Sequence, residues 1–192
     1  MRKIIRHIKK NNMPIFLALC LTLLGSCSKE NEPYAPLRAS AMIRGVLVSV
    51  DSKDNKDALS NKDFIDEIII IGDQSDKTIP FTVINLADDS DERNFISFNA
   101  EIPDVKNFIF KNKYEAYGQS IVSIIVKNQT IKLQCSFKFI CSNPDSFGNN
   151  SIILEKIEYN GNTILREDNL INSNIVLYLD ESLQLTAQTK KK

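Results

Sequence analysis

The feature that most constrains the fold of this 192-residue chain is a strict alternation of apolar and polar side chains between Thr130 and Cys141. Its apolar members stand at every second position: Ile131, Leu133, Cys135, Phe137, Phe139 and Cys141. Successive side chains of a β-strand point to opposite faces, so this segment predicts a long strand with one face on a core and one in water. Shorter alternations begin at Ile96 and Ile175.

From residue 41 onward the chain is a succession of short apolar runs separated by clusters of Asn, Asp, Gly and Pro. This spacing is typical of an all-β fold. Asn160-Gly161 predicts a hairpin because both residues tolerate positive φ, and Asn128-Gln129 marks a second hairpin. Such short links join antiparallel neighbours. We expect a single β domain over 41–187, built as an antiparallel β-sandwich (immunoglobulin- or transthyretin-like) or as a barrel.

Three segments are less regular. The runs Ile68–Ile71 and Ile79–Leu86 are apolar at nearly every position, which favours strands in the centre of a sheet. The segment Asp54–Asp66 fits two structures equally well. It forms either a short helix capped by Ser60 or a loop that leads into the strand at Ile68.

The first 26 residues have the composition of a removable export signal. Residues 1–13 hold five basic residues and no acid, and an uninterrupted apolar run follows over Pro14–Leu24. As a helix, this run would reach roughly 16 Å, about half of the ~30 Å hydrocarbon core of a bilayer. We therefore interpret 1–26 as a signal peptide and not as a transmembrane anchor.

The string Leu24–Cys27 (LGSC) resembles the lipobox of bacterial lipoproteins. This resemblance covers the signal only, and it implies cleavage before Cys27 and lipid on the Cys27 sulfur. Cys20 offers a competing register, but the large residue Leu19 precedes it. Two or more acyl chains hold a protein stably in a membrane. Cys27 is therefore the predicted lipid-attachment site, and the membrane is the predicted first partner.

Residues 27–40 predict a lipidated cysteine and a flexible tether, because they are mostly polar and contain two prolines. Glu30 and Glu32, soon after the cysteine, resemble the export signals of Bacteroidota surface lipoproteins. That resemblance implies an outer membrane lipoprotein exposed at the cell surface. Loss of the basic signal leaves a mildly acidic chain, which argues against a nucleic-acid partner. Residues 188–192 are expected to be a frayed basic tail.

The mature chain lacks several groups on which enzymes and metal sites depend. Its only histidine, His7, lies in the signal, so Ser-His-Asp catalysis, Cys-His catalysis and histidine-ligated metals are excluded. Met42 is the only methionine beyond the signal, which excludes a thioether copper site. We accordingly predict no catalytic residue, no cofactor, no metal ion and no enzymatic activity.

Cys135 and Cys141 are the thiols of the predicted domain. Six residues of continuous strand place their Cα atoms roughly 20 Å apart, whereas a disulfide needs less than ~7 Å. We expect two buried, unbridged thiols on the core face of the strand.

Acidic and aromatic groups provide the remaining candidate sites. The acidic run Asp88–Glu92 carries oxygen ligands for Ca²⁺. A separate group of three aspartates earlier in the chain does so too: Asp51, Asp54 and Asp57. Neither group follows the order of an EF-hand, so we interpret both as solvated loops. Tyr114 and Tyr117 form either a small platform on which a sugar could stack or two caps at a sheet edge.

Two functions follow from these residues. The first is a lipid-anchored envelope lipoprotein with a non-enzymatic binding or assembly role at the cell surface, whose partner is an envelope protein or a glycan. The alternative is a carboxylate-based glycoside hydrolase or a glycan-binding module. A hydrolase needs two acids that converge in a concave site, one of them with a raised pKa.

Overall fold

The structure is a computed structural model, and it describes residues 37, 39–52, 57–88, 91–142, 149–166, 175–179 and 185–189. The signal, Cys27, most of the tether and the last three lysines lie outside the described residues. Within these ranges the chain is almost entirely β, with two sheets, which confirms the predicted all-β class. None of the helices in these ranges has the length and apolar character that crossing a membrane requires.

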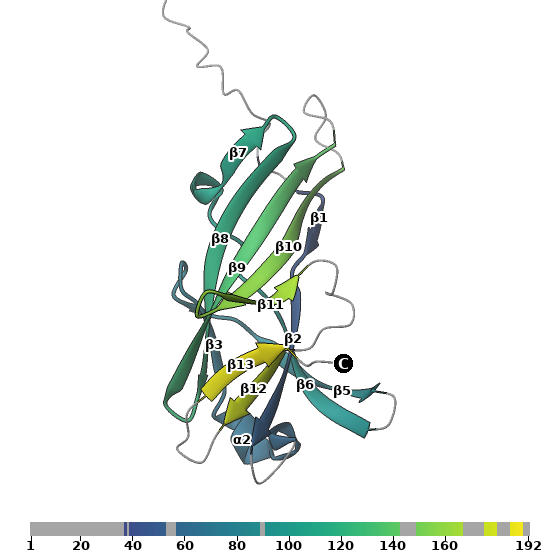
Figure 1. The fold of residues 1–192 in the computed structure, drawn as a ribbon, viewed down its shortest axis with the longest axis vertical. Helices are drawn as coiled ribbons and strands as arrows, with labels where there is room; N and C mark the ends of the chain where they lie inside the picture. Colours follow the sequence, from purple (N-terminus) through teal and green to yellow (C-terminus); the bar gives the residue numbers. More distant parts are fainter. Residues whose placement is uncertain are drawn as a thin grey trace, which may run out of the picture. The chain divides into compact units, whose positions relative to one another are not determined.

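The larger sheet has eight strands (Figure 1). Its strands follow the order β1-β10-β9-β8-β3-β4, with β11 also paired to β10 and β7 also paired to β8. Their bounds are β1 Ala41–Ile43, β3 Ile69–Gly72, β4 Lys77–Thr78, β7 Ile109–Asn112, β8 Glu115–Val126, β9 Gln129–Cys141, β10 Asn150–Tyr159 and β11 Asn162–Arg166.

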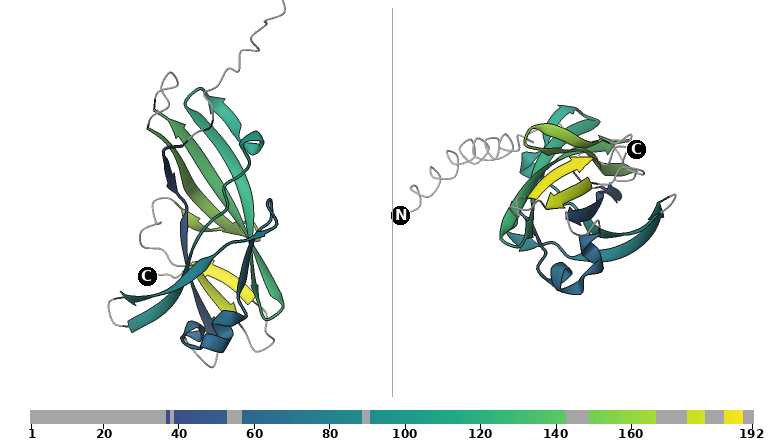
Figure 2. Two further views of the ribbon diagram at one scale, coloured as in Figure 1. Left: turned by 180° about the vertical axis from the view of Figure 1, so that it is seen from behind. Right: turned by 60° about the horizontal axis from the view of Figure 1, so that its bottom comes forward.

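The smaller sheet has five strands in the order β13-β12-β2-β6-β5. Its strands and the short helical segments beside it are β2 Gly45–Ser52, β5 Phe81–Asp88, β6 Asp91–Asn99, β12 Ile175–Leu179, β13 Leu185–Thr189, η1 Ala58–Ser60 and α2 Lys62–Asp66. A further 3₁₀ turn, η2 Val105–Asn107, precedes β7. The last strand ends two residues beyond the predicted domain boundary at 187. The hairpin of β5 and β6 stands out to one side of the other strands (Figure 2).

Two of the points at which the chain passes between the two sheets are bonded to each other. Arg44 separates β1 from β2, and Ala100 follows β6. The Ala100 amide donates to the Arg44 carbonyl over 2.9 Å, and the Arg44 guanidinium donates to the Ala100 carbonyl over 3.3 Å. Two pairings, β1 with β10 and β12 with β2, are parallel, so the sheets are mixed and not purely antiparallel.

The long alternation seen in the sequence is strand β9. Its six alternate apolar side chains are all at most 2% exposed, and the positions between them are intermediate or exposed. These side chains belong to one core cluster that also contains Val46, Val48 and Val50 of β2. The core therefore lies between the two sheets, as the alternation predicts.

Both predicted hairpins form, one of them with a shifted turn. Asn160 and Gly161 have φ of 49° and 76° and join β10 to β11, as expected. In the hairpin of β8 and β9, Val126 pairs with Gln129, so the two turn residues are Lys127 and Asn128 with φ of 45° and 67°. Positive φ at both central positions is the type I′ pattern, whose twist matches that of the flanking strands.

Two expectations about the irregular segments need correction. Strand β5 was expected to be central, but it lies at the edge of its sheet. It is apolar on both faces because Val83 lies toward the core and Ile84 pairs with the buried Phe95. The segment before β3 does contain a short helix, α2, but its cap is Asn61, whose side chain accepts from the Asp63 amide.

Candidate binding site

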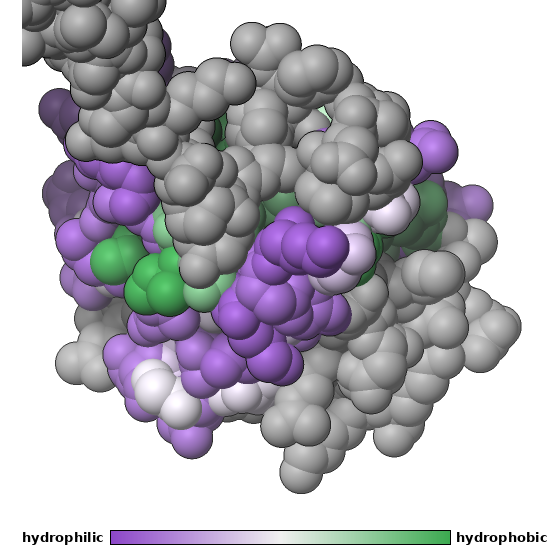
Figure 3. Space-filling model, turned by 90° about the horizontal axis from the view of Figure 1, so that it is seen from above, coloured by the Kyte–Doolittle hydropathy of each residue, from purple (hydrophilic) through white to green (hydrophobic). Residues whose placement is uncertain are grey.

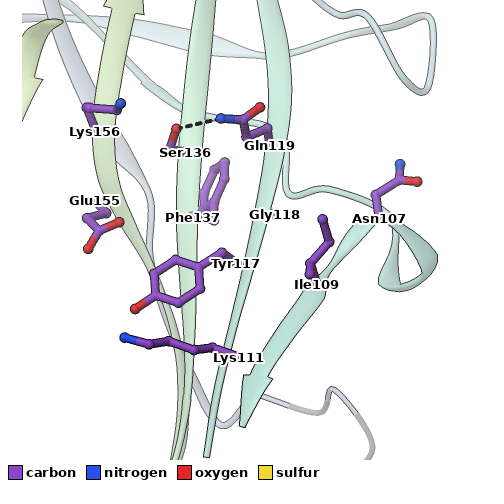
Figure 4. Close-up of a pocket in the computed structure, with 10 residues that line it drawn as sticks. All are labelled: Asn107, Ile109, Lys111, Tyr117, Gly118, Gln119, Ser136, Phe137, Glu155 and Lys156. Atoms are coloured by element: carbon purple, nitrogen blue, oxygen red, sulfur yellow. Dashed lines mark hydrogen bonds between the residues drawn. The ribbon is translucent and has the colours of Figure 1, made fainter.

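A hollow of about 610 Å³ lies over β7, β8, β9 and β10 (Figure 4). Most of its lining side chains are polar or charged. The lining residues are Asn107, Ile109, Lys111, Tyr117, Gly118, Gln119, Ser136, Phe137, Glu155 and Lys156. We refer to this set of residues as the hollow.

Each of the two walls of the hollow is built on a β-bulge. In β7, Phe110 pairs with Ala116 and Asn112 with Glu115, which leaves Lys111 as the extra residue. In β10 the register shifts between Leu154 and Lys156, which leaves Glu155 as the extra residue. Bulges redirect side chains and are frequent next to functional sites. The two bulges place residues of opposite charge on opposite walls.

The floor of the hollow is the pair β8 and β9. Phe137 is fully buried, and its cross-strand partner is Gly118. A Cβ on Gly118 would lie 3.1 Å from both the Pro103 and the Phe108 side chains. The missing side chain therefore lets the segment that carries Pro103 and Phe108 pack closely on β8, just before the wall formed by β7.

Tyr117 stands near the middle of the hollow, between the two bulged walls (Figure 4). Its cross-strand partners are Ile109 on β7 and Lys138 on β9. The Lys138 ammonium lies 5.9 Å from the centre of the ring, within the range of a cation–π contact. The Tyr117 hydroxyl donates to Glu115 over a long 3.4 Å. Tyr117 is thus held by its neighbours while its ring faces the hollow.

The charges beside Tyr117 form a surface network. Lys138 contacts Glu115 at 3.2 Å, and Lys111 lies 4.0 Å from the same carboxylate. The hydrogen bond from Lys138 lowers the pKa of the Glu115 carboxyl, and the same contact raises the pKa of the Lys138 ammonium. On the other wall, Lys156 contacts Glu158 at 2.9 Å. The ammonium groups of Lys111, Lys138 and Lys156 therefore each lie near a carboxylate, and the first two share Glu115.

The remaining polar groups of the hollow are less engaged. The Gln119 amide donates to the Ser136 hydroxyl over 3.3 Å, which leaves the amide oxygen able to accept. Apolar side chains are also exposed at the wall formed by β7 and in the turn before it: Ile109 is 77% exposed and Val105 is 64% exposed. The view from above shows green, apolar residues among purple, hydrophilic ones (Figure 3).

Of the candidate residues from the sequence, only Tyr117 lies in the hollow. Tyr114 is in the turn between β7 and β8, where it is 42% exposed and contacts Lys113. Tyr117 belongs to strand β8 and Tyr114 to the turn before it, so the two tyrosines do not form the shared platform that was one of the two alternatives. Cys27 lies outside the described residues.

Two of the acidic candidates, Asp51 and Asp57, form contacts outside the hollow, and Asp54 lies outside the described residues. Asp51 forms a 2.6 Å ion pair with Arg93, and Asp57 accepts from the side chain of Asn94. In the part of the chain that the structure describes, no three Cys, Asp or Glu side chains are grouped so as to hold a metal ion. These aspartates therefore fasten β2 and η1 to β6.

Cys135 and Cys141 are free and buried, as predicted. Burial raises the pKa of the Cys135 thiol to about 12. Its sulfur is thus kept protonated and inaccessible at neutral pH, so it behaves as a small apolar core group.

Sequence reasoning missed the two bulge residues. A signal for Glu155 was present, because the buried apolar residues change parity between Leu154 and Ile157. Such a change of parity within a strand marks an extra residue. Lys111 lies in a strand too short to show a period. Its place in the hollow depends on the pairing of β7 with β8, which is not encoded locally.

The comparisons with known proteins give no further assignment. No protein-family model matches the chain, and neither a curated protein nor a solved structure is significantly similar to it. The functional argument therefore rests on the residues of the chain itself.

Proposed function

We propose that this chain is a lipid-anchored, non-enzymatic binding protein of the cell envelope. Support for the anchor comes from the sequence, where LGSC contains the predicted cleavage site, before Cys27, and the predicted lipid site, Cys27 itself. Support for binding comes from the hollow. The observation that carries the proposal is that the two bulges direct Lys111 and Glu155 to opposite walls of one concave surface.

The composition of the hollow favours binding over hydrolysis. Among the residues that line it, Glu155 is the one carboxylate. Glycoside hydrolysis by an acid pair needs two carboxyl groups on either side of the scissile bond. The lining otherwise supplies hydroxyl, amide and ammonium groups, which hold a ligand by hydrogen bonds without chemistry on it.

The proposed location is the outer membrane, with the domain displayed at the cell surface. The acidic residues that follow Cys27 support outward export, and the tether would carry the domain away from the lipid. An envelope protein or a glycan of the same surface is the proposed class of partner.

Anchoring and binding can be tested together in cells that express the full-length protein. We expect the wild type to partition into the detergent phase and Cys27→Ser to partition into the aqueous phase. Captured envelope material should fall in the double variant K111M/E155Q, while the amount of anchored protein stays the same. Glu155-dependent release of reducing sugar ends would contradict the non-enzymatic proposal. Unchanged partitioning of Cys27→Ser would contradict the anchor.

A further inference from the structure

One wall of the hollow is the edge strand β7, which pairs only with β8 among the described strands, but the floor of the hollow lies on the face of a sheet. Beneath it, β8 is paired on both sides, to β7 and β9, and β9 is paired on both sides, to β8 and β10. Backbone groups that are used within the sheet are not available for strand addition, which is the usual way to recognise an extended peptide. A ligand on the floor of the hollow must therefore be recognised by side chains.

The charges of the hollow indicate a ligand with no net charge. Lys111 and Glu155 both line it, the Lys111 ammonium reaches to within 4.0 Å of Glu115, and the charge of Lys156 is offset by Glu158 at 2.9 Å (Figure 4). No ion pair or hydrogen bond of the Glu155 carboxylate is found within the described ranges. A strongly anionic or cationic ligand would meet groups of both signs in the hollow, some favourable and some repulsive.

The hydrogen-bonding groups indicate a ligand rich in hydroxyls. An ionised Glu155 only accepts, Lys111 only donates, and the amides of Asn107 and Gln119 do both. A sugar hydroxyl also donates and accepts, so vicinal hydroxyls match this mixed lining better than a carbonyl or an amine does.

An apolar strip crosses the same surface. Tyr117 and Ile109 are cross-strand partners, and Ile109 is 77% exposed. The Tyr117 ring and the exposed Ile109 side chain thus give the hollow apolar surface among its polar groups. The C–H face of a pyranose ring is apolar, while its rim carries hydroxyls. The apolar face would match Tyr117 and Ile109, and the hydroxyls would match the polar groups around them.

From these four observations we infer that the hollow is a binding site for a neutral glycan, with Tyr117 as the stacking residue and Glu155 and Lys111 as the residues that bind hydroxyl groups. This inference rests on the proposed binding function and specifies the ligand class of that same hollow.

Affinity gel electrophoresis of the full-length protein in mild detergent tests the inference. The gels contain one of four neutral polysaccharides: an α-glucan, a β-glucan, a xylan or a mannan. We expect at least one of them to retard the wild type relative to a non-binding marker protein. Tyr117→Ala should weaken that retardation roughly tenfold, and Tyr117→Phe should preserve it because the stacking ring remains.

Each substitution has a matched control elsewhere on the surface. Tyr178 lies on β12 and is 42% exposed, Glu92 lies on β6 and Lys62 lies on α2, all outside the hollow. Glu155→Gln and Lys111→Met should each weaken retardation, whereas Tyr178→Ala, Glu92→Gln and Lys62→Met should leave it unchanged. Ile109→Ser provides a second test of the apolar strip, since so exposed a side chain contributes little to folding.

Three outcomes would overturn the inference. The first is that no neutral polysaccharide retards the wild type. The second is that only an anionic polysaccharide such as polygalacturonate does so, with an effect that high salt removes. The third is that the hollow variants and their controls lose retardation equally. If no glycan binds but whole cells yield a protein partner that K111M/E155Q loses, the glycan inference fails while the proposed binding function stands.

Discussion

The outer faces of the two sheets differ sharply. On the larger sheet, the face away from the core is polar and carries the hollow, with Gln119 and Ser136 on neighbouring strands. On the smaller sheet, the corresponding face is covered: Ser49, Phe95 and Val176 are each 1% exposed and alternate with residues of the main core. One sheet thus offers a surface for binding, while the other is buried on both faces near its centre.

The two sheets also differ in how their buried polar groups are hydrogen-bonded. The Ser49 hydroxyl is buried and has no hydrogen-bond partner among the residues that the structure describes. A buried serine of the larger sheet, Ser120, is 2% exposed and donates to the Glu101 carbonyl over 2.6 Å. Substitutions on each sheet can test whether the two sheets differ in this way.

The largest expected effect is the loss of stability when either of two buried phenylalanines, Phe137 or Phe95, is replaced. Phe137→Ala should lower the free energy of unfolding by about 3–5 kcal/mol, because it leaves a cavity in the main core. If the outer face of the smaller sheet is covered, Phe95→Ala should have an effect of similar size. Urea unfolding of both variants measures this. A loss below about 1 kcal/mol for Phe95→Ala would show that this face is open to solvent.

The two buried serines should respond in opposite directions. Ser120→Ala removes a hydrogen bond and should destabilise the protein by about 1 kcal/mol. Ser49→Ala removes an unsatisfied hydroxyl and should be neutral or stabilise by up to about 1 kcal/mol. Urea midpoints at constant m-value provide the comparison. Equal destabilisation by both substitutions would mean that Ser49 has a partner.

A smaller, pH-dependent effect is expected at the end of the larger sheet. Asp73 accepts from Ser123 over 2.6 Å and from Lys132 over 2.8 Å. Burial raises the pKa of the Asp73 carboxyl, but the hydrogen bonds from Lys132 and Ser123 outweigh it, so the pKa lies below its ordinary 3.8. The folded state then binds protons less readily than the unfolded state.

The stabilisation by Asp73 should therefore be complete above its ordinary pKa and be lost as the pH falls through the lowered value. Asp73→Asn should be less stable than the wild type at neutral pH, and the difference should shrink on acidification. Thermal melts along a pH series measure it. A difference that persists unchanged into acid would argue against a lowered pKa.

The last prediction concerns the reactivity of the two thiols, which is the simplest property to measure. Cys135 and Cys141 should resist a thiol reagent in the native protein at neutral pH and react only after denaturation, because both are buried and unbridged. Rapid labelling of either residue in the native state would contradict their place in the core.

The sequence was most informative about the core where one face of a strand is exposed to solvent. The alternation over β9 predicted each residue of its core face. It also predicted that Cys135 and Cys141 are too far apart along the strand to form a disulfide. Alternation fails where both faces are covered, so Phe95 and Val176 were not recognised as buried and β5 was misread as a central strand. The pairing of distant strands has no local signal, and it decides which strands lie at an edge.

The candidate site was only partly predictable for the same reason. Tyr117 could be singled out because of its residue type, although its place in a strand could not be foreseen. Glu155 was marked by a change of parity in β10, but its proximity to Lys111 depends on four strands pairing in one order. Neither bulge could therefore be recognised as part of a site before the sheet was assembled.

The proposed binding surface is the outer face of β7–β10 and not the smaller sheet. The most direct test is an amide NMR spectrum of the full-length protein in detergent, recorded with and without the neutral polysaccharide that retards it. We predict that the largest shifts will cluster around Lys111, Tyr117, Gln119 and Glu155. Shifts confined to β2, β6 and β12, with the hollow unchanged, would contradict the account.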